Sequence, residues 1–397
     1  MAQPTTETAS KPRRSLKRAP PARFKEGVRD PRGLPPACYV SPTFHEREIE
    51  TIFRKEWICI GRVEDVAKPG DYVSIDIVGE PLVMVCDLEG NLRVHSRICR
   101  HRSMILVEGA GNARSFNCPY HAWVYGLDGR LAGAPEMEHT PGFDRAACRL
   151  PGPKVEVWEG FVFVNFDPGA KPLAPRVEKL ARFLANWRMG EMVAVRSFDF
   201  DVDWNWKVMI DNYIEAYHHI GAHRLSLEPV MPTRLVRVED LPGPFTIVHM
   251  PHVEDTDVSG FYTTGEAQAK LPPIPTLTEE EKRRPSLIHM FPAHLMSTYA
   301  DRMEYYLVLP RGAGALTIRK VMCVPKAALE RPDFERAMKV VTDQYLKFRV
   351  EDVGVNDGVM RGLRSRYAAP PHLCHLERPL LEFAEWLLKR TGPPPAR

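Results

Sequence analysis

Residues 99–123 read CRHRSMILVEGAGNARSFNCPYHAW, and they contain two short pairs of metal-binding residue types. Cys99 and His101 form the first pair, and Cys118 and His121 form the second. Each pair offers one thiolate and one imidazole from a single loop. Two such loops brought together would present two sulfur and two nitrogen ligands, so this segment predicts a metal centre held between them.

Two kinds of metal centre use this set of ligands. Zinc accepts it tetrahedrally, whereas a Rieske [2Fe–2S] cluster takes both thiolates on one iron and both imidazoles on the other. A zinc finger usually pairs like with like, but each loop here holds one ligand of each kind. The surrounding segments also carry glycines typical of turns between short strands, namely Gly109, Gly111, Gly126 and Gly129. This arrangement favours the iron–sulfur cluster, with a structural zinc protein as the alternative.

The sequences around both pairs resemble the cluster loops of Rieske proteins. CRHRSMIL (99–106) resembles the first loop, and CPYHAWVYGLDGRL (118–131) resembles the second. The resemblance implies four cluster ligands, Cys99, His101, Cys118 and His121. Ser103 and Ala122 depart from the pattern, because the family commonly has glycine at both positions.

A second group of metal-binding residue types lies in WNWKVMIDNYIEAYHHIGAH (204–223). Glu215 lies three residues before His218, and His223 follows five residues after it. The spacing predicts a helix over 208–221, which would put Glu215 and His218 on one face and His223 just past its end. Two histidines and a carboxylate form the facial triad of non-haem Fe(II) oxygenases, which leaves positions open for O₂. Histidine pairs on helices are more often packing residues, so the spacing alone leaves both interpretations open.

The stretch NWK…DNYIEAYHHIGAH resembles the iron-binding segment of the catalytic subunits of Rieske oxygenases. This resemblance implies that His218 and His223 ligate a mononuclear Fe(II). His219 adjoins His218 but would point away from it on the predicted helix. The resemblance also implies that Glu215 is not a ligand but bridges the iron site to a cluster histidine of the neighbouring subunit. Many ring-hydroxylating members have aspartate there, whereas glutamate resembles the choline and carnitine monooxygenases and related N- and O-demethylases.

The third iron ligand must be a carboxylate from farther along the chain. FRVEDVGVNDGVMRGLRS (348–365) resembles the late helix of the family, which carries the aspartate ligand, and this implies Asp352. Asp357 and Glu351 are the alternatives. Met360 stands where the family usually has glutamine.

Together the two centres imply a terminal oxygenase. In the family, electrons pass from NAD(P)H through a separate flavin and iron–sulfur reductase, in some members through a ferredoxin, to the Rieske cluster and then to the iron that uses O₂. The chain has no G-x-G-x-x-G dinucleotide fingerprint after a strand, so the reductase is expected to be another protein. The family also implies a head-to-tail homotrimer (α₃). An electron carrier with only a working Rieske domain is the alternative from another class.

The reaction expected first is monooxygenation of a small organic molecule, including oxidative N- or O-dealkylation, and aromatic cis-dihydroxylation is the alternative. The substrate pocket is expected between residues 204–217 and the strands of 245–310. Aromatic side chains could form a cage there for a quaternary ammonium group. The candidates are Trp204, Tyr213, Tyr217, Tyr262, Tyr299 and Tyr305.

The chain of 397 residues is long enough for two domains. Residues 1–39 are expected to form a basic tail, and residues 40–166, with short strands and frequent turns, an all-β Rieske domain. The Pro- and Gly-rich stretch 167–175 begins the catalytic domain, residues 167–397. Its helices and antiparallel strands predict an α+β class, and the resemblance implies a helix-grip (START-like) fold.

The composition excludes several classes of protein. The 54 basic and 51 acidic residues give a net charge of +3, which is too balanced to indicate nucleic-acid binding. No uninterrupted apolar stretch is long enough for a membrane span. Eight cysteines are far fewer than in a disulfide scaffold, and no signal peptide is evident, so we expect reduced thiols and a cytoplasmic location.

Overall fold

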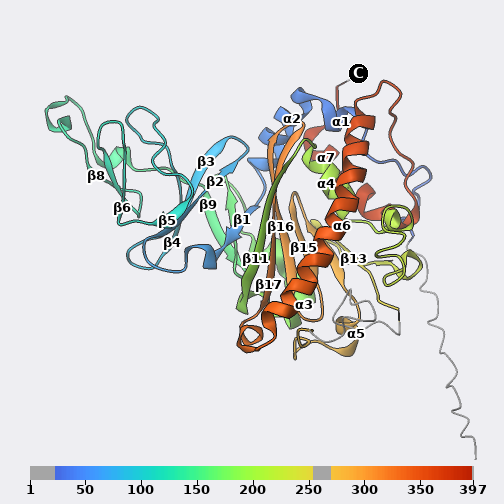
Figure 1. The fold of residues 1–397 in the computed structure, drawn as a ribbon. Helices are drawn as coiled ribbons and strands as arrows, with labels where there is room; N and C mark the ends of the chain where they lie inside the picture. The colour runs from blue at the N-terminus through green and yellow to red at the C-terminus, as the bar shows by residue number, and fades with distance from the viewer. Residues whose placement is uncertain (1–22, 254–269, 396–397) are drawn as a thin grey trace, which may run out of the picture.

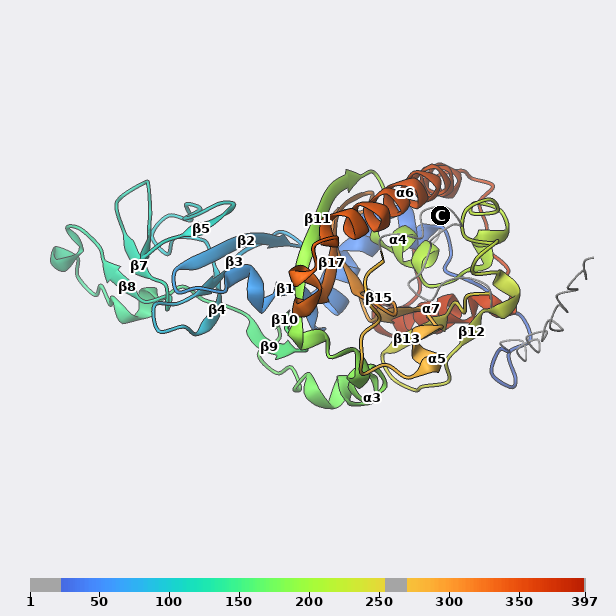
Figure 2. The same ribbon diagram turned by 60° about the horizontal axis from the view of Figure 1, so that its bottom comes forward.

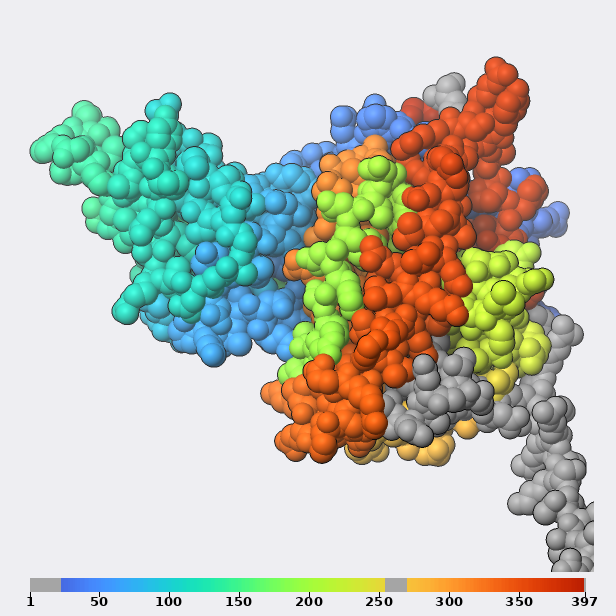
Figure 3. Space-filling view, in the orientation of Figure 1, coloured from blue at the N-terminus to red at the C-terminus, as the bar shows by residue number. Residues whose placement is uncertain are grey.

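The computed structural model describes residues 23–253 and 270–395. An all-β part, which includes the segment quoted above, projects from a larger part built of helices and one long sheet (Figure 1). The space-filling view shows the first part as a lobe that touches the second along one side (Figure 3). The predicted α+β class is confirmed. Residues 1–22 of the predicted basic tail lie outside the described residues.

The first part consists of three small antiparallel sheets. The first has the order β1 (Ile58–Arg62), β10 (Phe161–Asn165) and β9 (Lys154–Trp158). The second has the order β4 (Leu92–Ser96), β3 (Glu80–Cys86), β2 (Asp71–Ile77) and β5 (Ala110–Asn112). The third has the order β6 (Ser115–Asn117), β7 (Val124–Gly126) and β8 (Leu131–Gly133). Strands β2 and β3 form an antiparallel hairpin, as do β9 and β10, which agrees with the short strands and frequent turns predicted for this region.

The second part is organised around a seven-stranded antiparallel sheet. Its order is β11 (Met192–Val202), β17 (Ala315–Pro325), β16 (Met303–Gly312), β15 (His294–Thr298), β14 (Ser286–Met290), β13 (Phe245–His249) and β12 (Arg237–Val238). Its helices are α3 (Ala174–Leu184), α4 (Trp206–Tyr213), α5 (Glu279–Lys282), α6 (Phe334–Leu363) and α7 (Arg378–Thr391). The long helix α6 crosses one face of this sheet, with α4 beside it (Figure 1). None of the described helices is both long and apolar enough to cross a membrane.

The two parts meet where strands β1 and β10 lie against the long sheet (Figure 2). Phe161 of β10 packs edge-on against Tyr305 of β16, with ring centroids 5.1 Å apart, and against His294 of β15 at 4.7 Å. Arg62 of β1 is buried, lies over the Phe161 ring and donates hydrogen bonds to the backbone oxygens of Met189 and Met192. Aromatic packing and the hydrogen bonds of this buried guanidinium therefore fix the junction.

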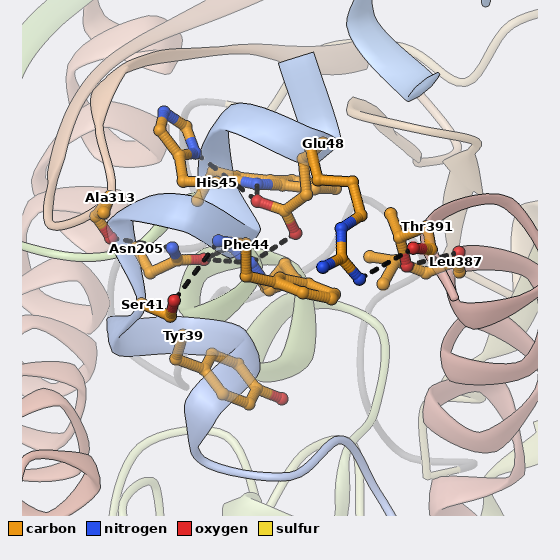
Figure 4. A network of polar contacts seen from close by, with 12 residues as sticks. Tyr39, Ser41, Phe44, His45, Glu48, Asn205, Ala313, Leu387 and Thr391 are labelled. Carbon is orange, nitrogen blue, oxygen red and sulfur yellow. Dashed lines mark hydrogen bonds and ion pairs between the residues drawn. The ribbon is translucent and has the colours of Figure 1, made fainter. Parts of the chain in front are cut away.

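Short helices near the start of the described chain brace the base of α4. They are α1 (Ala37–Val40), α2 (Pro42–Glu48) and the π-helical turn η1 (Ile49–Phe53). Glu48 pairs with Lys207 at 2.6 Å and accepts a hydrogen bond from the Trp206 indole, and both members of the ion pair are fully buried. Asn205 caps α4 and donates to the backbone oxygen of Ala313 (Figure 4). This network fixes the start of the helix that leads to the histidine segment.

The helix predicted over 208–221 is wrong beyond Tyr213, where α4 ends. A separate 3₁₀ turn, η7 (Tyr217–Ile220), follows. The cause is Glu215, whose carboxylate accepts hydrogen bonds from the backbone N–H groups of Tyr217 and His218. A side chain that bonds these donors starts a new turn and competes with continuation of the helix.

Candidate metal centres

The two loops with the Cys–His pairs have the same backbone geometry. Cys99 N donates to Met104 O, and Ser103 N donates back to Cys99 O. In the second loop, Cys118 N donates to Trp123 O, and Ala122 N donates back to Cys118 O. Ser103 and Ala122 have φ angles of +57° and +52°. This left-handed conformation favours glycine, which gives a physical reason for the glycine that the family commonly has at both positions.

The donor atoms of the two loops fit an iron–sulfur cluster of the Rieske type. Cys99 and Cys118 are only 2% and 3% exposed, whereas the side chains of His101 and His121 are exposed, with ring centroids 4.6 Å apart. The Tyr125 hydroxyl lies 3.4 Å from Cys99 Sγ and accepts a hydrogen bond from the backbone of Arg100. Buried sulfurs on one side and paired imidazoles at the surface match the two-thiolate, two-imidazole division of such a cluster.

A second donor group lies between η7 and α6. Donor atoms of His218, His223 and Asp352 all lie within 4.8 Å of one another. Asp352 Oδ1 is 3.0 Å from His223 Nε2 and 3.8 Å from His218 Nε2. The structure thus brings together the three residues that the sequence singled out, including one carboxylate from a distant helix. Two imidazoles and one carboxylate are a suitable set for a mononuclear iron with open positions.

Carboxylates on the far side of each imidazole set its orientation. Glu215 Oε1 lies 2.6 Å from His218 Nδ1, and Glu351 Oε2 lies 2.7 Å from His223 Nδ1. Both rings therefore turn Nε2 toward Asp352, as metal-binding histidines commonly do when a carboxylate holds the other nitrogen. Burial lowers the pKa of His223, but hydrogen bonds and charges of Asp352 and Glu351 outweigh it and raise the pKa overall. Such a concentration of negative charge suits a bound cation.

The alternative acids occupy other places. Glu351 contacts His223 from the side opposite Asp352 and also accepts a hydrogen bond from the Ser226 hydroxyl at 2.7 Å. Asp357 is exposed and accepts a hydrogen bond from the Trp204 indole at 2.7 Å. Of these three acids, only Asp352 lies within reach of both histidines.

Two other residues noted in the sequence lie outside this donor group. His219 is buried beside both histidines, with ring centroids 4.9 Å from His218 and 5.4 Å from His223. It is hydrogen-bonded to the backbone of Met231 and is not part of the group of three. Met360 is buried, 3% exposed.

The donor group opens into a cavity of about 120 Å³ between α4, α6 and the long sheet. Of the predicted pocket aromatics, Tyr213 and Tyr299 line it. Trp204 and Tyr305 are buried elsewhere, Tyr217 is 46% exposed outside it, and Tyr262 lies outside the described residues. Arg302, Glu304 and Tyr306 also line it and lie within the predicted range 245–310, although the sequence did not single them out. Lys320, Tyr345 and Phe348 line it from outside the predicted ranges.

Two known domain families match the chain. Residues 56–144 match the Rieske [2Fe-2S] domain, and residues 189–392 match the ring hydroxylating alpha subunit (catalytic domain). The first match contains the two Cys–His loops, and the second contains the group of His218, His223 and Asp352.

Proteins of similar sequence and structure agree with these matches. The carnitine monooxygenase oxygenase subunit of Acinetobacter pittii is 30% identical over 345 residues, which cover 84% of this chain and 85% of that protein. Choline monooxygenase of Atriplex hortensis is 25% identical over 367 residues, 89% of this chain and 76% of that protein. A solved quaternary ammonium Rieske monooxygenase has the same fold, with a TM-score of 0.79 and 24% identity. The match covers 95% of this chain and 100% of that one. Naphthalene 1,2-dioxygenase from Rhodococcus sp. also shares it, with a TM-score of 0.72, 19% identity and coverage of 91% and 95%.

Proposed function

The chain belongs to the Rieske non-haem iron oxygenases as a catalytic (alpha) subunit, and we propose that it hydroxylates a small quaternary ammonium compound at a carbon next to nitrogen. Its cofactors are a Rieske [2Fe–2S] cluster and a mononuclear iron. The observation that carries the proposal is the group of His218, His223 and Asp352 at the edge of a cavity that has one wall of charged and tyrosine side chains.

We further propose the residues that hold each cofactor and the domains that contain them. The cluster ligands are Cys99, His101, Cys118 and His121, and the iron ligands are His218, His223 and Asp352. The buried thiolates with exposed imidazoles, and the imidazoles that face one carboxylate, support these assignments. Residues 40–166 serve as the cluster domain and residues 167–397 as the iron domain, and the two family matches fall within these ranges.

The character of the cavity favours a polar substrate over an aromatic hydrocarbon. Arg302, Glu304 and Lys320 line it and are nearly fully buried. These charges already pair with one another, and a purely apolar ring beside them would offer no further polar partner. The Tyr213 ring and the carboxylates of Glu215 and Asp352, which also line the cavity, are suited to an ammonium group. This consideration, with the names of the carnitine and choline monooxygenase relatives, favours monooxygenation over cis-dihydroxylation.

The proposed reaction inserts one oxygen atom into a C–H bond. Iron held by the three ligands would supply the activation of O₂, with the second oxygen atom leaving as water and two electrons and two protons consumed. A hydroxyl group on a carbon bonded to nitrogen makes the C–N bond labile, so the product divides into an amine and an aldehyde. Glu351 and Glu215 keep the two imidazoles oriented throughout.

Electrons reach this chain from another protein, because members of the family depend on a separate reductase. We propose a flavin and iron–sulfur reductase that oxidises NAD(P)H and passes the electrons to the cluster. A ferredoxin could carry the electrons in place of direct contact, and reconstitution with each donor separates the two arrangements.

We also propose a head-to-tail homotrimer, in which the cluster of one subunit serves the iron of the next through Glu215. In Figure 1 the cluster loops, next to β6 and β7, lie in the projecting part, well away from α4 and α6. Large apolar side chains are exposed at both ends of the proposed contact. Tyr120 is 50% exposed beside His121, and Ile220 is 50% exposed in the turn that carries His218. Exposed apolar groups at such sites are typical of a protein interface.

Product analysis with ¹⁸O₂ tests the reaction. The purified protein, with a reductase of this class and NADH, receives either quaternary ammonium compounds or naphthalene. We expect a labelled oxygen atom in the aldehyde fragment of the first, trapped by reduction before it exchanges with water, and no diol from the second. A cis-diol with two labelled atoms would overturn the monooxygenase proposal.

Hybrid oligomers test the assembly. A Cys118→Ser variant lacks a working cluster, and a His223→Ala variant lacks a working iron site. Mixed and reassembled subunits should regain part of the turnover that each variant alone lacks, because a good cluster then faces a good iron site across one interface. A monomer with full coupled turnover would contradict the trimer.

A further inference from the structure

One wall of the cavity carries its own cation against aromatic rings. This strand wall comprises Ser297, Tyr299, Arg302, Glu304, Tyr306 and Lys320. Lys320 on β17 lies directly opposite Tyr306 on β16 in the sheet. Its Nζ atom is 3.6 Å from the ring centroid of Tyr345 on α6 and 5.2 Å from that of Tyr306. The lysine thus occupies the place between two tyrosines where a ligand cation would otherwise be expected.

A second cation sits in the same wall. Arg302 donates from Nε to Glu304 Oε1 at 2.8 Å and from Nη1 to Asp301 Oδ1 at 2.8 Å. Its guanidinium lies over the ring of Tyr299, 3.9 Å from the centroid. The available face of this third tyrosine is therefore also taken by a cation of the protein.

The carboxylate that balances these cations is already paired with both of them. Glu304 Oε1 is bonded to Arg302, and Glu304 Oε2 is paired with Lys320 at 2.6 Å. Burial raises the pKa of Glu304, but the charges of Lys320 and Arg302 outweigh it, so the pKa lies below its usual value. Among the residues that the structure describes, Lys320 has this one ion-pair partner for its three N–H donors. The strand wall therefore holds two cations and one carboxylate, and that carboxylate is shared between them.

We propose that Lys320 binds an anionic group of the substrate, a carboxylate, and that this contact determines specificity. A second ammonium group at this wall would meet like charges and ring faces that are already occupied. A carboxylate would meet a buried ammonium with free donors, and charge-assisted hydrogen bonds of this kind are strong in a site of low dielectric constant. Asp301, which balances Arg302, does not line the cavity, so the strand wall itself presents two cations and one anion.

This inference rests on the proposed function and fixes the orientation of the substrate. With its carboxylate at Lys320, a zwitterion would direct its ammonium group toward the other end of the cavity, where Asp352 and Glu215 supply negative charge and Tyr213 supplies a ring. The carbon atoms next to nitrogen would then lie beside the proposed iron ligands. Cations that lack a carboxylate would have no such anchor and should be poor substrates.

A matched pair of ligands tests the proposal. Each member of a series of betaines with increasing chain length is compared with its neutral carboxamide, which keeps the ammonium group and the shape. The dissociation constant and kcat/KM are measured for the wild type, Lys320→Met and Lys320→Arg. We expect the wild type to prefer the best betaine about tenfold or more over its carboxamide. Lys320→Met should abolish the preference mainly through KM, and Lys320→Arg, which keeps the charge, should retain it.

Other results are equally informative. Circular dichroism and the melting temperature show whether each variant is folded, and retention of preference by a folded Lys320→Met variant would overturn the proposal. Equal turnover of betaine and carboxamide by the wild type would overturn it as well, while leaving the proposed function standing. If no quaternary ammonium compound reacts, the proposed substrate class fails. Butyrate alone then tests Lys320: protection of the wild type but not of Lys320→Met against thermal unfolding supports the anion site, and no difference overturns it.

Discussion

Glu351 provides the sharpest test of the iron site, because the sequence offered it as a ligand and the structure gives it a different position. Its Oε2 atom contacts His223 Nδ1 and the Ser226 hydroxyl, each at 2.7 Å. In this position it orients His223 and does not face Asp352. Replacement of Glu351 by alanine should therefore weaken metal binding without abolishing it.

The expected size of the effect follows from this contact. Loss of a carboxylate that holds a metal-binding histidine typically reduces metal affinity 10- to 100-fold, or about 1.4 to 2.7 kcal/mol. Glu351→Ala should fall in this range. Ser226→Ala removes a neighbour of the carboxylate but leaves the contact of Glu351 with His223, so it should lower the metal affinity less than tenfold. Asp352→Ala removes a proposed ligand and should cause a much larger loss than either.

The assay is an anaerobic titration of the iron-depleted protein with Fe(II) or Co(II), followed by calorimetry. Chelation must spare the cluster, whose absorption spectrum then serves as an internal control in each variant, because its proposed ligands lie in the other part of the chain. Two results would refute the reasoning. One is an unchanged affinity in Glu351→Ala, and the other is a loss as complete as that of Asp352→Ala.

Three further predictions concern stability. Ser103→Gly and Ala122→Gly should each raise the free energy of unfolding of the cluster part by about 1 kcal/mol, since both positions have positive φ; bleaching of the cluster in urea measures this. Burial lowers the pKa of His294 to about 3, so this residue is neutral when folded and takes up a proton on unfolding below about pH 6.5. The neutral, buried His294 therefore contributes its full share to the free energy of unfolding above that pH and loses it as the pH falls toward 3. At pH 5 the free energy of unfolding is lower by about 2 kcal/mol. His294→Phe should make the melting temperature less dependent on pH. Lys207→Met removes the lysine partner of the fully buried Glu48 and should lower the free energy of unfolding by about 3 to 5 kcal/mol. The double change with Glu48→Leu should restore part of this loss. Thermal unfolding measures both.

Each stability prediction has a result that would contradict it. A glycine substitution that lowers the stability of the cluster part would show that the left-handed conformation is not a source of strain. An identical pH profile in wild type and His294→Phe would show that another group dominates acid unfolding. A double change no more stable than Lys207→Met alone would show that the unpaired charge is not the cause of the loss.

The cluster loops were open to prediction because all their proposed ligands lie within one short segment. The iron site was harder, since Asp352 approaches His223 from a helix more than a hundred residues later, and only a family resemblance linked the two. Helical spacing was misleading at 208–221. There the Glu215 carboxylate captures two backbone N–H groups, a local contact that periodicity does not reveal.

The lining of the cavity depended on strand phase, which aromatic content alone does not give. Successive residues of a strand face opposite sides of the sheet, so only one of the neighbours Tyr305 and Tyr306 can face the cavity, and the sequence favoured the wrong one. Tyr305 packs on Phe161 at the junction of the two parts, and Tyr306 lines the cavity. A signal was nevertheless present. Glu304 and Lys320 are charged residues next to apolar runs in two central strands, and buried charges in such strands need a reason.

The contacts of Glu215 connect the local fold with the proposed assembly. One carboxylate oxygen accepts from the backbone of Tyr217 and His218, and the other lies 2.6 Å from His218 Nδ1. A carboxylate offers about four lone-pair positions, so three donors within the chain leave room for one more. An exposed imidazole such as that of His121 on a neighbouring subunit could supply this donor without displacing the others. The contacts that end helix α4 and orient His218 therefore also leave an acceptor for the contact between subunits that the trimer requires.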